Sequence, residues 1–237
     1  MPSLPASWRL PWPGLCLVCR QAQWQAVCQH CLSAFAAPRL RCGRCALALK
    51  AGRPECLACE DKPPEFDRAI AAVDYTSPWR ELIAQFKFNG DVALAKPLSE
   101  LMADRLGQLP PRRRPQWLIP TPLSTARLRE RGFNQSWQLA RQLSRQMGIP
   151  TLPEAVRRVK DTPRMMTLEA DDRRQHIRGA FEVTQSCRRA LAGRHVALVD
   201  DVLTTGATLD EITRTLQDAG VRQVSVWVLA RTPTPGA

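Results

Sequence analysis

Short apolar runs alternate with amphipathic stretches through the last two thirds of the chain. Each short run of aliphatic or β-branched residues predicts a strand, and apolar residues spaced three and four apart predict a helix. The expected strands are 68–75, 117–119, 196–199 and 221–229. The expected helices are 78–88, 92–106, 136–147 and 209–219. Strands that alternate with helices are typical of an α/β domain with a parallel sheet.

One of these strands is followed at once by acidic and small polar residues. The apolar run 196–199 leads into two aspartates, and the loop before the next helix contains Thr-Thr-Gly-Ala-Thr. Ligands of open α/β sheets collect at the carboxyl ends of the strands, so we expect a binding site here. The candidate residues are Asp200, Asp201, Thr204, Thr205, Gly206, Ala207 and Thr208.

The loop at 204–208 suits a phosphate group. Gly206 lets the backbone approach a ligand, threonine hydroxyls can donate hydrogen bonds, and the start of the next helix favours an anion. Ionised Asp200 and Asp201 accept hydrogen bonds only, so they could hold vicinal ribose hydroxyls or a hard cation such as Mg²⁺. The loop is not a Walker loop, because Gly-Lys-Ser/Thr is missing. The alternative is an Asp-rich turn with a threonine helix cap.

The first quarter of the chain has a different pattern, with few apolar runs and many cysteines. Eight cysteines form four Cys-x-x-Cys pairs, a spacing that predicts all-cysteine zinc sites. We expect two structural zinc ions, with sequential pairing as the simpler arrangement and cross-bracing as the alternative. Disulfides are not expected in a reducing compartment, and a thioredoxin-like site needs one such pair. The predicted ligands are Cys16, Cys19, Cys28, Cys31, Cys42, Cys45, Cys56 and Cys59.

A proline-containing linker, Lys62-Pro63-Pro64, separates the two patterns. We therefore expect a double zinc ribbon domain at 1–62 and an α/β domain at 63–237. The metal should serve folding, because so few apolar residues cannot build a core alone. Replacing Cys16 by Ser should loosen the first domain and leave the second folded. His30 is not expected to be a ligand, and Cys187 is expected to be a free thiol.

Positive charge is concentrated in one segment. The formal net charge is +12, and between positions 105 and 160 twelve Arg and Lys residues are balanced by Glu130 and Glu154 alone. Such a cluster beside a phosphate loop indicates a polyanionic ligand, nucleic acid being the obvious class. Arg outnumbers Lys 29 to 5, which fits phosphate recognition by planar guanidinium groups. A GC-rich genome would also favour Arg codons, but it would not cluster them.

A second candidate site follows the expected strand 117–119. A proline-constrained turn leads there into a segment with guanidinium and amide groups, which bind phosphate oxygens well. These groups should contact either the pyrophosphate of a ligand or the phosphates of DNA. The candidates are Arg127, Arg129, Arg131, Asn134 and Gln135. Lys87, near the end of the helix 78–88, is interpreted as a solvated lysine in preference to a phosphate contact.

The chain contains no apolar run near the roughly 20 residues needed to span a bilayer. Its first 14 residues lack the apolar region of a signal peptide, so a cytoplasmic protein is expected. The stretch 155–183 is the least regular part of the α/β domain. It is either a mobile lid or an ordinary surface excursion.

The order of these motifs resembles two known patterns. An apolar strand, Asp-Asp, Thr-Thr-Gly-x-Thr and a helix resemble the phosphoribosyl-pyrophosphate (PRPP) fingerprint of type I phosphoribosyltransferases. Four Cys-x-x-Cys pairs, Arg-Gly-Phe-Asn-Gln, Asp-Thr-Pro, Gly-Ala-Phe and the Asp-Asp-Val-Leu-Thr-Thr-Gly-Ala-Thr loop together resemble the ComF family. Those proteins combine a phosphoribosyltransferase-like domain with an N-terminal double zinc ribbon, and they are associated with natural competence and use of external DNA.

The resemblance implies a Rossmann-like parallel sheet of the type I phosphoribosyltransferase kind. It also implies binding of PRPP with Mg²⁺, binding of incoming single-stranded DNA, and contact with the DNA-uptake machinery. The sequence departs from the family pattern where Met165 and His176 replace Gln and Asn, and where Asp172 replaces Glu. Lid chemistry is therefore not carried over, and no catalytic residue is assigned.

Two hypotheses of different class follow. The first is a DNA-processing accessory protein whose phosphoribosyl site senses a ligand or has chemistry not yet identified. The second is an active nucleobase phosphoribosyltransferase of nucleotide salvage. The first is favoured, because only 230–237 follow the last expected strand, too few for a C-terminal hood over a base. No aromatic residue near the loop marks a platform for a base either.

Overall fold

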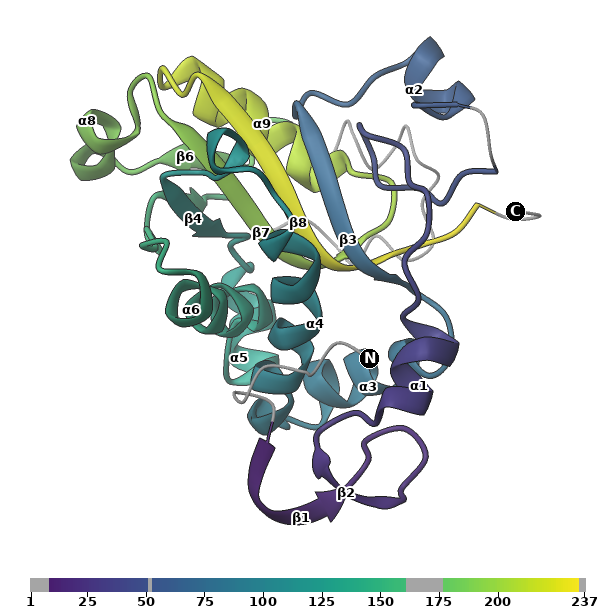
Figure 1. Ribbon diagram of the computed structural model, residues 1–237. Coiled ribbons are helices and arrows are strands. Elements are labelled where there is room, and N and C mark those ends of the chain that lie inside the picture. The colour runs from purple at the N-terminus through teal and green to yellow at the C-terminus, as the bar shows by residue number, and fades with distance from the viewer. Residues whose placement is uncertain (1–8, 51–52, 161–176, 235–237) are drawn as a thin grey trace.

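The computed structural model describes residues 9–50, 53–160 and 177–234. Its centre is a parallel sheet of four strands in the order β3-β8-β7-β4 (Figure 1). The strands are β3 (Arg68–Asp74), β4 (Trp117–Pro120), β7 (His195–Leu203) and β8 (Gln223–Arg231). All four predicted strands are therefore confirmed. β7 extends further than predicted, so the two aspartates lie within the strand and not after it.

The two central strands are buried on both faces of the sheet. In β8, Trp227 and Leu229 face one hydrophobic cluster, while Val226 and Val228 face the other. The two clusters thus take alternate residues, as the period of two in a strand requires. A strand buried on both faces reads as a continuous apolar run, which is why β7 and β8 stand out in the sequence.

Helices cover both faces of this sheet (Figure 1). α4 (Ala95–Gly107) and α6 (Gln135–Met147) pack on one face with α3 (Trp79–Phe88), and α9 (Ala207–Asp218) packs on the other. The predicted helices are confirmed, although 92–94 form a 3-10 turn before α4. Gly148 ends α6 in the left-handed conformation with φ 68°.

Shorter elements complete the α/β part. They are α5 (Thr125–Arg131), the 3-10 turns Pro111–Arg113 and Gln185–Cys187, α8 (Arg188–Leu191), and the antiparallel pair β5 (Val156–Arg158) and β6 (Phe181–Val183). The segment 161–176, with Met165, Asp172 and His176, lies outside the described residues.

The N-terminal part contains two small units of similar design. β1 (Arg9–Leu15) pairs with β2 (Ala22–Gln25) in antiparallel fashion, and α1 (Gln29–Phe35) follows. The second unit ends in α2 (Leu57–Asp61). In Figure 1, β1 and β2 lie below α3 and α1 lies beside it, whereas the second unit lies beside β3.

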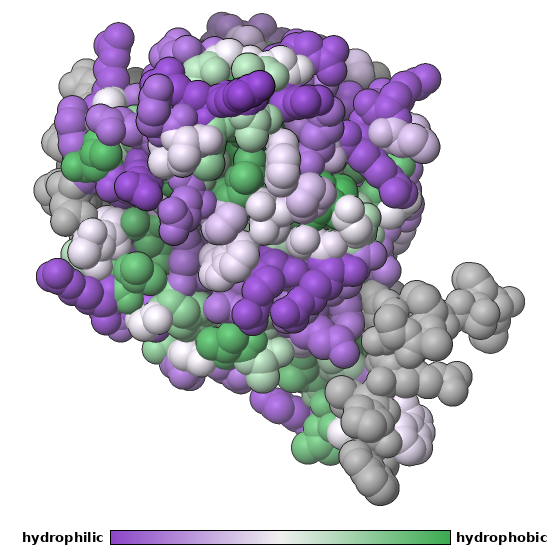
Figure 2. All heavy atoms as spheres, turned by 90° about the vertical axis from the view of Figure 1, so that its left-hand side faces the viewer, coloured by the Kyte–Doolittle hydropathy of each residue, from purple (hydrophilic) through white to green (hydrophobic). Residues whose placement is uncertain are grey.

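The face over β4 and α6 is mostly hydrophilic. Figure 2 shows hydrophobic residues on this face only in small, separate areas. Isolated apolar residues are normal on a protein surface, so this face does not resemble a large apolar interface. Among the described residues, no helix is both long and apolar enough to cross a bilayer.

Candidate functional site

A cavity of about 250 Å³ lies at the carboxyl edge of the sheet. Tyr75, Thr121 and Val202 line it, and they come from the ends of β3, β4 and β7. Of the twelve residues predicted to bind phosphate, ribose or pyrophosphate, seven line the same cavity. They are Asp200, Asp201, Thr204, Thr208, Arg127, Arg131 and Gln135. Two stretches about seventy residues apart in sequence thus meet in one site.

The acidic pair is hydrogen-bonded and ion-paired inside the cavity. Ser136 Oγ donates to Asp200 Oδ1 at 2.7 Å, and the backbone N–H of Asp201 donates to the same oxygen at 2.9 Å. Lys87 Nζ lies 2.9 Å from Asp201 Oδ1, with side-chain exposures of 17% and 10%. The pair therefore has one hydrogen-bonded carboxylate and one carboxylate that faces a cation.

The prediction for Lys87 is wrong. The side chain is not solvated: it lines the cavity and neutralises Asp201. The reason is tertiary, because Ile83 and Phe86 of α3 are buried in the core and bring the end of that helix to the carboxyl edge of the sheet. The only sequence signal was a lysine between two phenylalanines at a helix end.

Burial changes the pKa of one member of this pair, Asp200. Desolvation, and then the charge of Asp201, raise the pKa of Asp200 to about 6, although the bond from Ser136 lowers it. A hydroxyl donor or a cation bound here would favour the ionised form and oppose the shift. Burial also lowers the pKa of Arg131, but an arginine remains protonated at neutral pH.

The basic wall of the cavity comes from one face of α5. Arg127 and Arg131 are one helical turn apart, so both point to the cavity, whereas Arg129 is exposed and does not line it. Arg131 Nη1 donates to Gln135 Oε1 at 3.0 Å, and its guanidinium lies 5.1 Å from the ring centroid of Phe88. Residues four apart lie on the same face of a helix, so helix periodicity places Arg127 and Arg131 in the cavity wall and Arg129 on the surface.

The threonine loop begins α9 as predicted. Gly206 has φ 85° and is the residue before the helix, and Asp210 N donates to Gly206 O at 2.8 Å. The N–H groups of the first turn precede that bond and have no partner within the helix, so they are free to meet an anion. Thr205 is exposed and, like Gly206 and Ala207, does not line the cavity.

Asn134 holds two elements of the site in place. Its Oδ1 accepts from Trp137 N at 3.2 Å at the start of α6, and its Nδ2 donates to Thr121 O at 3.0 Å. Its amide is therefore engaged with the protein itself. Tyr75, Ser136 and Arg158 also line the cavity and were not predicted. The signal for Tyr75 was its position directly after a strand of the sheet, and it is an aromatic residue where none was expected.

The eight cysteines form two sequential groups, and the cross-braced alternative is wrong. Within each group the four sulfur atoms lie within 4.8 Å of one another. Cys19 and Cys28 sulfurs are 3.7 Å apart, and Cys45 and Cys56 sulfurs are 3.6 Å apart. A tetrahedral ion with metal–sulfur bonds of about 2.3 Å would separate its ligands by about 3.8 Å, so both groups fit zinc.

The first group also shows how the protein prepares a thiolate. Burial opposes ionisation of Cys16, but backbone N–H groups of Cys28, Cys19 and Val18 outweigh it and lower its pKa to about 6. Burial and neighbouring sulfurs raise the pKa of Cys31. Four thiolates therefore cannot form together without a cation, and metal binding would release protons. His30 is exposed and, like Cys187, belongs to neither group.

Comparisons with known proteins agree with this geometry. Residues 134–236 match the family model described as phosphoribosyl transferase domain. Competence protein F of Haemophilus influenzae is 39% identical over 80% of this chain and 84% of its own length. DNA utilization protein YhgH of Escherichia coli (strain K12) is 35% identical over 93% of this chain and 98% of its own length.

Solved structures are more distant. The purine phosphoribosyltransferase from Pyrococcus horikoshii is 15% identical, with a TM-score of 0.35, over 57% of this chain and 80% of that one. The matched domain model, the parallel sheet and the two four-cysteine groups establish the fold class. The chain has a type I phosphoribosyltransferase fold preceded by a small cysteine-rich part of the zinc ribbon kind.

Proposed function

The chain belongs to the ComF family of competence and DNA-utilisation proteins, and we propose that its cavity binds PRPP or a related phosphoribosyl ligand with Mg²⁺. We propose further that the protein binds single-stranded DNA and acts with the DNA-uptake machinery, while two zinc ions hold its N-terminal part together. The observation that carries the ligand proposal is the meeting of a buried acidic pair, a basic wall and a threonine loop in one cavity.

Each part of the cavity has a matching part of the ligand. The acidic pair, Asp200 and Asp201, accepts hydrogen bonds from vicinal ribose hydroxyls, and the start of α9 with Thr204 and Thr208 receives the 5′-phosphate. Arg127 and Arg131 face the pyrophosphate. Magnesium, a hard cation that takes oxygen ligands, would reduce the charge of the pyrophosphate next to the carboxylates. The cavity volume of about 250 Å³ lies near the lower end of the range of roughly 300–1,000 Å³ that is usual for small-ligand sites.

The DNA part of the proposal depends on charge and on the relatives. Both relatives are named for competence or DNA utilisation, and this chain has a net charge of +12. Exposed arginines, among them Arg112, Arg113 and Arg129, lie in the basic segment outside the cavity. They can bind phosphates while the cavity holds a ligand. The pocket arginines could serve either anion, so PRPP and DNA would then compete and weaken each other by the same factor.

Base transfer remains the second candidate, because Tyr75 provides an aromatic side chain in the cavity. An assay of PRPP consumption with a panel of nucleobases, with and without single-stranded DNA, tests it. Pyrophosphate release with one base would establish a transferase. Binding without turnover would favour a ligand sensor.

The binding proposal is tested by calorimetry and thermal unfolding with PRPP and Mg²⁺. A ligand that binds only the native state raises the unfolding midpoint by mass action. Asp201→Asn should abolish that rise, and Asp91→Asn, at an exposed turn, is the matched control. Affinity should also fall as the pH drops through about 6, because Asp200 then takes up a proton. A wild-type protein that does not respond to millimolar PRPP contradicts the proposal.

Two arginines of α5 separate ligand binding from DNA binding. Arg127→Gln should lower the affinity for PRPP, while Arg129→Gln should leave that affinity unchanged, since of these two residues only Arg127 lines the cavity. If Arg129 contacts DNA, its loss should flatten the dependence of log K on log salt by about 0.7 for a single strand. An unchanged PRPP affinity in Arg127→Gln would contradict the role of Arg127, and an unchanged salt slope in Arg129→Gln would contradict the role of Arg129.

A further inference from the structure

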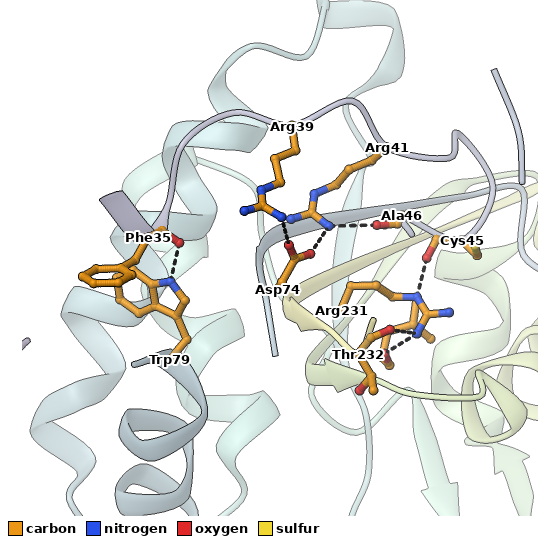
Figure 3. A network of polar contacts seen from close by, with 10 residues as sticks. Phe35, Arg39, Arg41, Cys45, Ala46, Asp74, Trp79, Arg231 and Thr232 are labelled. Atoms are coloured by element: carbon orange, nitrogen blue, oxygen red, sulfur yellow. Dashed lines mark hydrogen bonds and ion pairs between the residues drawn. The ribbon is translucent and has the colours of Figure 1, made fainter. Parts of the chain in front are cut away.

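Arg231 connects the second four-cysteine group to the candidate ligand site. It stands at the end of β8, and among the described residues its guanidinium donates to backbone carbonyls (Figure 3). Nε donates to Cys45 O at 2.9 Å, and Nη1 donates to Leu203 O at 3.0 Å, Thr204 O at 2.7 Å and Thr232 O at 2.8 Å. One rigid, planar group thus binds the cysteine turn and the start of the threonine loop at once.

A second arginine holds the next carbonyl of the same turn. Arg41 Nη1 donates to Ala46 O at 3.1 Å and lies 2.7 Å from Asp74 Oδ1, while Arg39 binds the other oxygen, Oδ2, at 3.0 Å (Figure 3). Asp74 ends β3, and the following residue, Tyr75, lines the ligand cavity. The turn after Cys45 is therefore fastened to the ends of β3 and β8.

The shape of this turn depends on the cysteine group. Ala46 has φ 59°, a left-handed conformation that is costly for a residue with a Cβ, and its N–H donates to Cys42 O at 2.9 Å. Ala46 is nevertheless buried against the sheet. A metal ion bound by Cys42 and Cys45 would hold both ends of the turn and so maintain this conformation. Without the ion, the Cys45 carbonyl would be held less firmly.

The other end of the connection is the ligand loop itself. Thr204 lines the cavity, and its carbonyl is one of the Arg231 acceptors. Thr205 and Gly206 follow and lead into the first turn of α9. A shift of Arg231 would therefore move the start of the loop that faces the phosphate.

We propose that metal occupancy of the second four-cysteine group controls phosphoribosyl-ligand affinity through Arg231. The proposal rests on the proposed function for the identity of the ligand. Both ends are held by direct hydrogen bonds, so loss of the ion and loss of the guanidinium should loosen the same loop. Because linkage is reciprocal, the ligand should also strengthen retention of this ion.

The test uses the full zinc-loaded chain, with zinc content, PRPP–Mg²⁺ affinity and hydrogen exchange as readouts. The Arg231→Met protein should keep two zinc ions. Its affinity for PRPP–Mg²⁺ should fall about tenfold, and hydrogen exchange at 203–208 should become faster. Arg44→Met is the matched control: Arg44 lies in the same cysteine turn but binds Glu55 at 3.2 Å, away from the loop. It should leave PRPP affinity and loop exchange unchanged.

Cys45→Ser should lose one zinc ion and weaken PRPP to a similar extent. The double variant Cys45→Ser/Arg231→Met should bind PRPP no more weakly than the single variant with the lower affinity, because both changes break the same connection. Additive losses, or a Cys45→Ser protein that lacks one ion yet binds PRPP normally, would overturn the proposal.

A third measurement decides the matter if Cys45→Ser does not fold. In the wild type, PRPP should slow transfer of one of the two zinc ions to a chelator, and Arg231→Met should remove that effect. Equal transfer rates with and without PRPP contradict the coupling. If the wild type does not bind PRPP at all, the proposed function fails, but the connection can still be tested. Faster hydrogen exchange in the loop after loss of the ion from the second four-cysteine group would support the connection. Unchanged exchange would refute it.

Discussion

The two four-cysteine groups have the same local design. In each, the residue after the second cysteine is left-handed, Arg20 with φ 62° and Ala46 with φ 59°. The third cysteine precedes a short helix whose first turn carries the fourth. An N–H of that third cysteine donates to the first sulfur at 3.4 Å in both groups. Local sequence therefore builds the same four-cysteine unit twice.

The groups differ in how they attach to the α/β domain. Cys16 and Cys31 are buried in the main core together with Trp79 and Leu106. Cys42, Cys56 and Cys59 instead form a small cluster of their own with nearby apolar residues of the same unit. The second group is joined to the sheet through the buried Ala46 and by polar contacts from arginines.

This contrast teaches that one motif can serve two purposes. The first group completes a hydrophobic core, so its loss should affect the whole fold. The second group rests on directional bonds at the ends of two strands, which suits control of a neighbouring site. The prediction that the α/β domain would stay folded without Cys16 treated the first group as separate, and the shared core argues against it.

The largest expected effect compares the first cysteine of each group. Cys16→Ser should lower the free energy of unfolding of the main transition by more than about 3 kcal/mol, because metal loss opens the core. Cys42→Ser should mainly cause local unfolding around 42–59 and change the main transition much less. Chemical denaturation with hydrogen exchange measures both. If Cys16→Ser and Cys42→Ser shift the main unfolding transition equally, the two groups do not differ in how they attach to the α/β domain.

A smaller effect is expected from the polar attachment of the second group. Asp74→Ala removes the partner of Arg39 and Arg41 and should cost about 1–3 kcal/mol, because it leaves a half-buried arginine unpaired. Exchange should speed up at 41–46 and stay unchanged at 16–28. Glu55→Ala, which breaks a more exposed pair with Arg44, should cost about 0–1 kcal/mol. Faster exchange in both groups would show that they are not independent.

The smallest effect tests the first group alone. Trp79 Nε1 donates to Phe35 O at 2.7 Å, at the end of the helix that carries Cys31 (Figure 3). Trp79→Phe should cost about 1 kcal/mol from the lost bond, plus a packing term, and should speed exchange at 29–36. Trp24→Phe, at a residue that is 52% exposed, is the control and should change little. A response at 42–46 would contradict the separation.

The sequence by itself determined the elements and the two groups of cysteines that could hold metal ions. Cys-x-x-Cys spacing, apolar runs and the order of Asp-Asp and Thr-Thr-Gly-Ala-Thr are local properties, and local geometry turns them into knuckles, buried strands and a loop before a helix. These features also carried the family resemblance. The location of the site at the carboxyl edge of the sheet could also be predicted, since residues that follow parallel strands meet at that edge.

Only the tertiary structure decided which charged groups act at the site. Lys87 reaches Asp201 across more than a hundred residues, and Arg129 points away while Arg127 and Arg131 point in. Arg231 was not singled out at all, because its acceptors are backbone carbonyls. Every residue offers a carbonyl, so no pattern of side chains marks such a contact. Its existence depends on how β8, the cysteine turn and the loop are packed together.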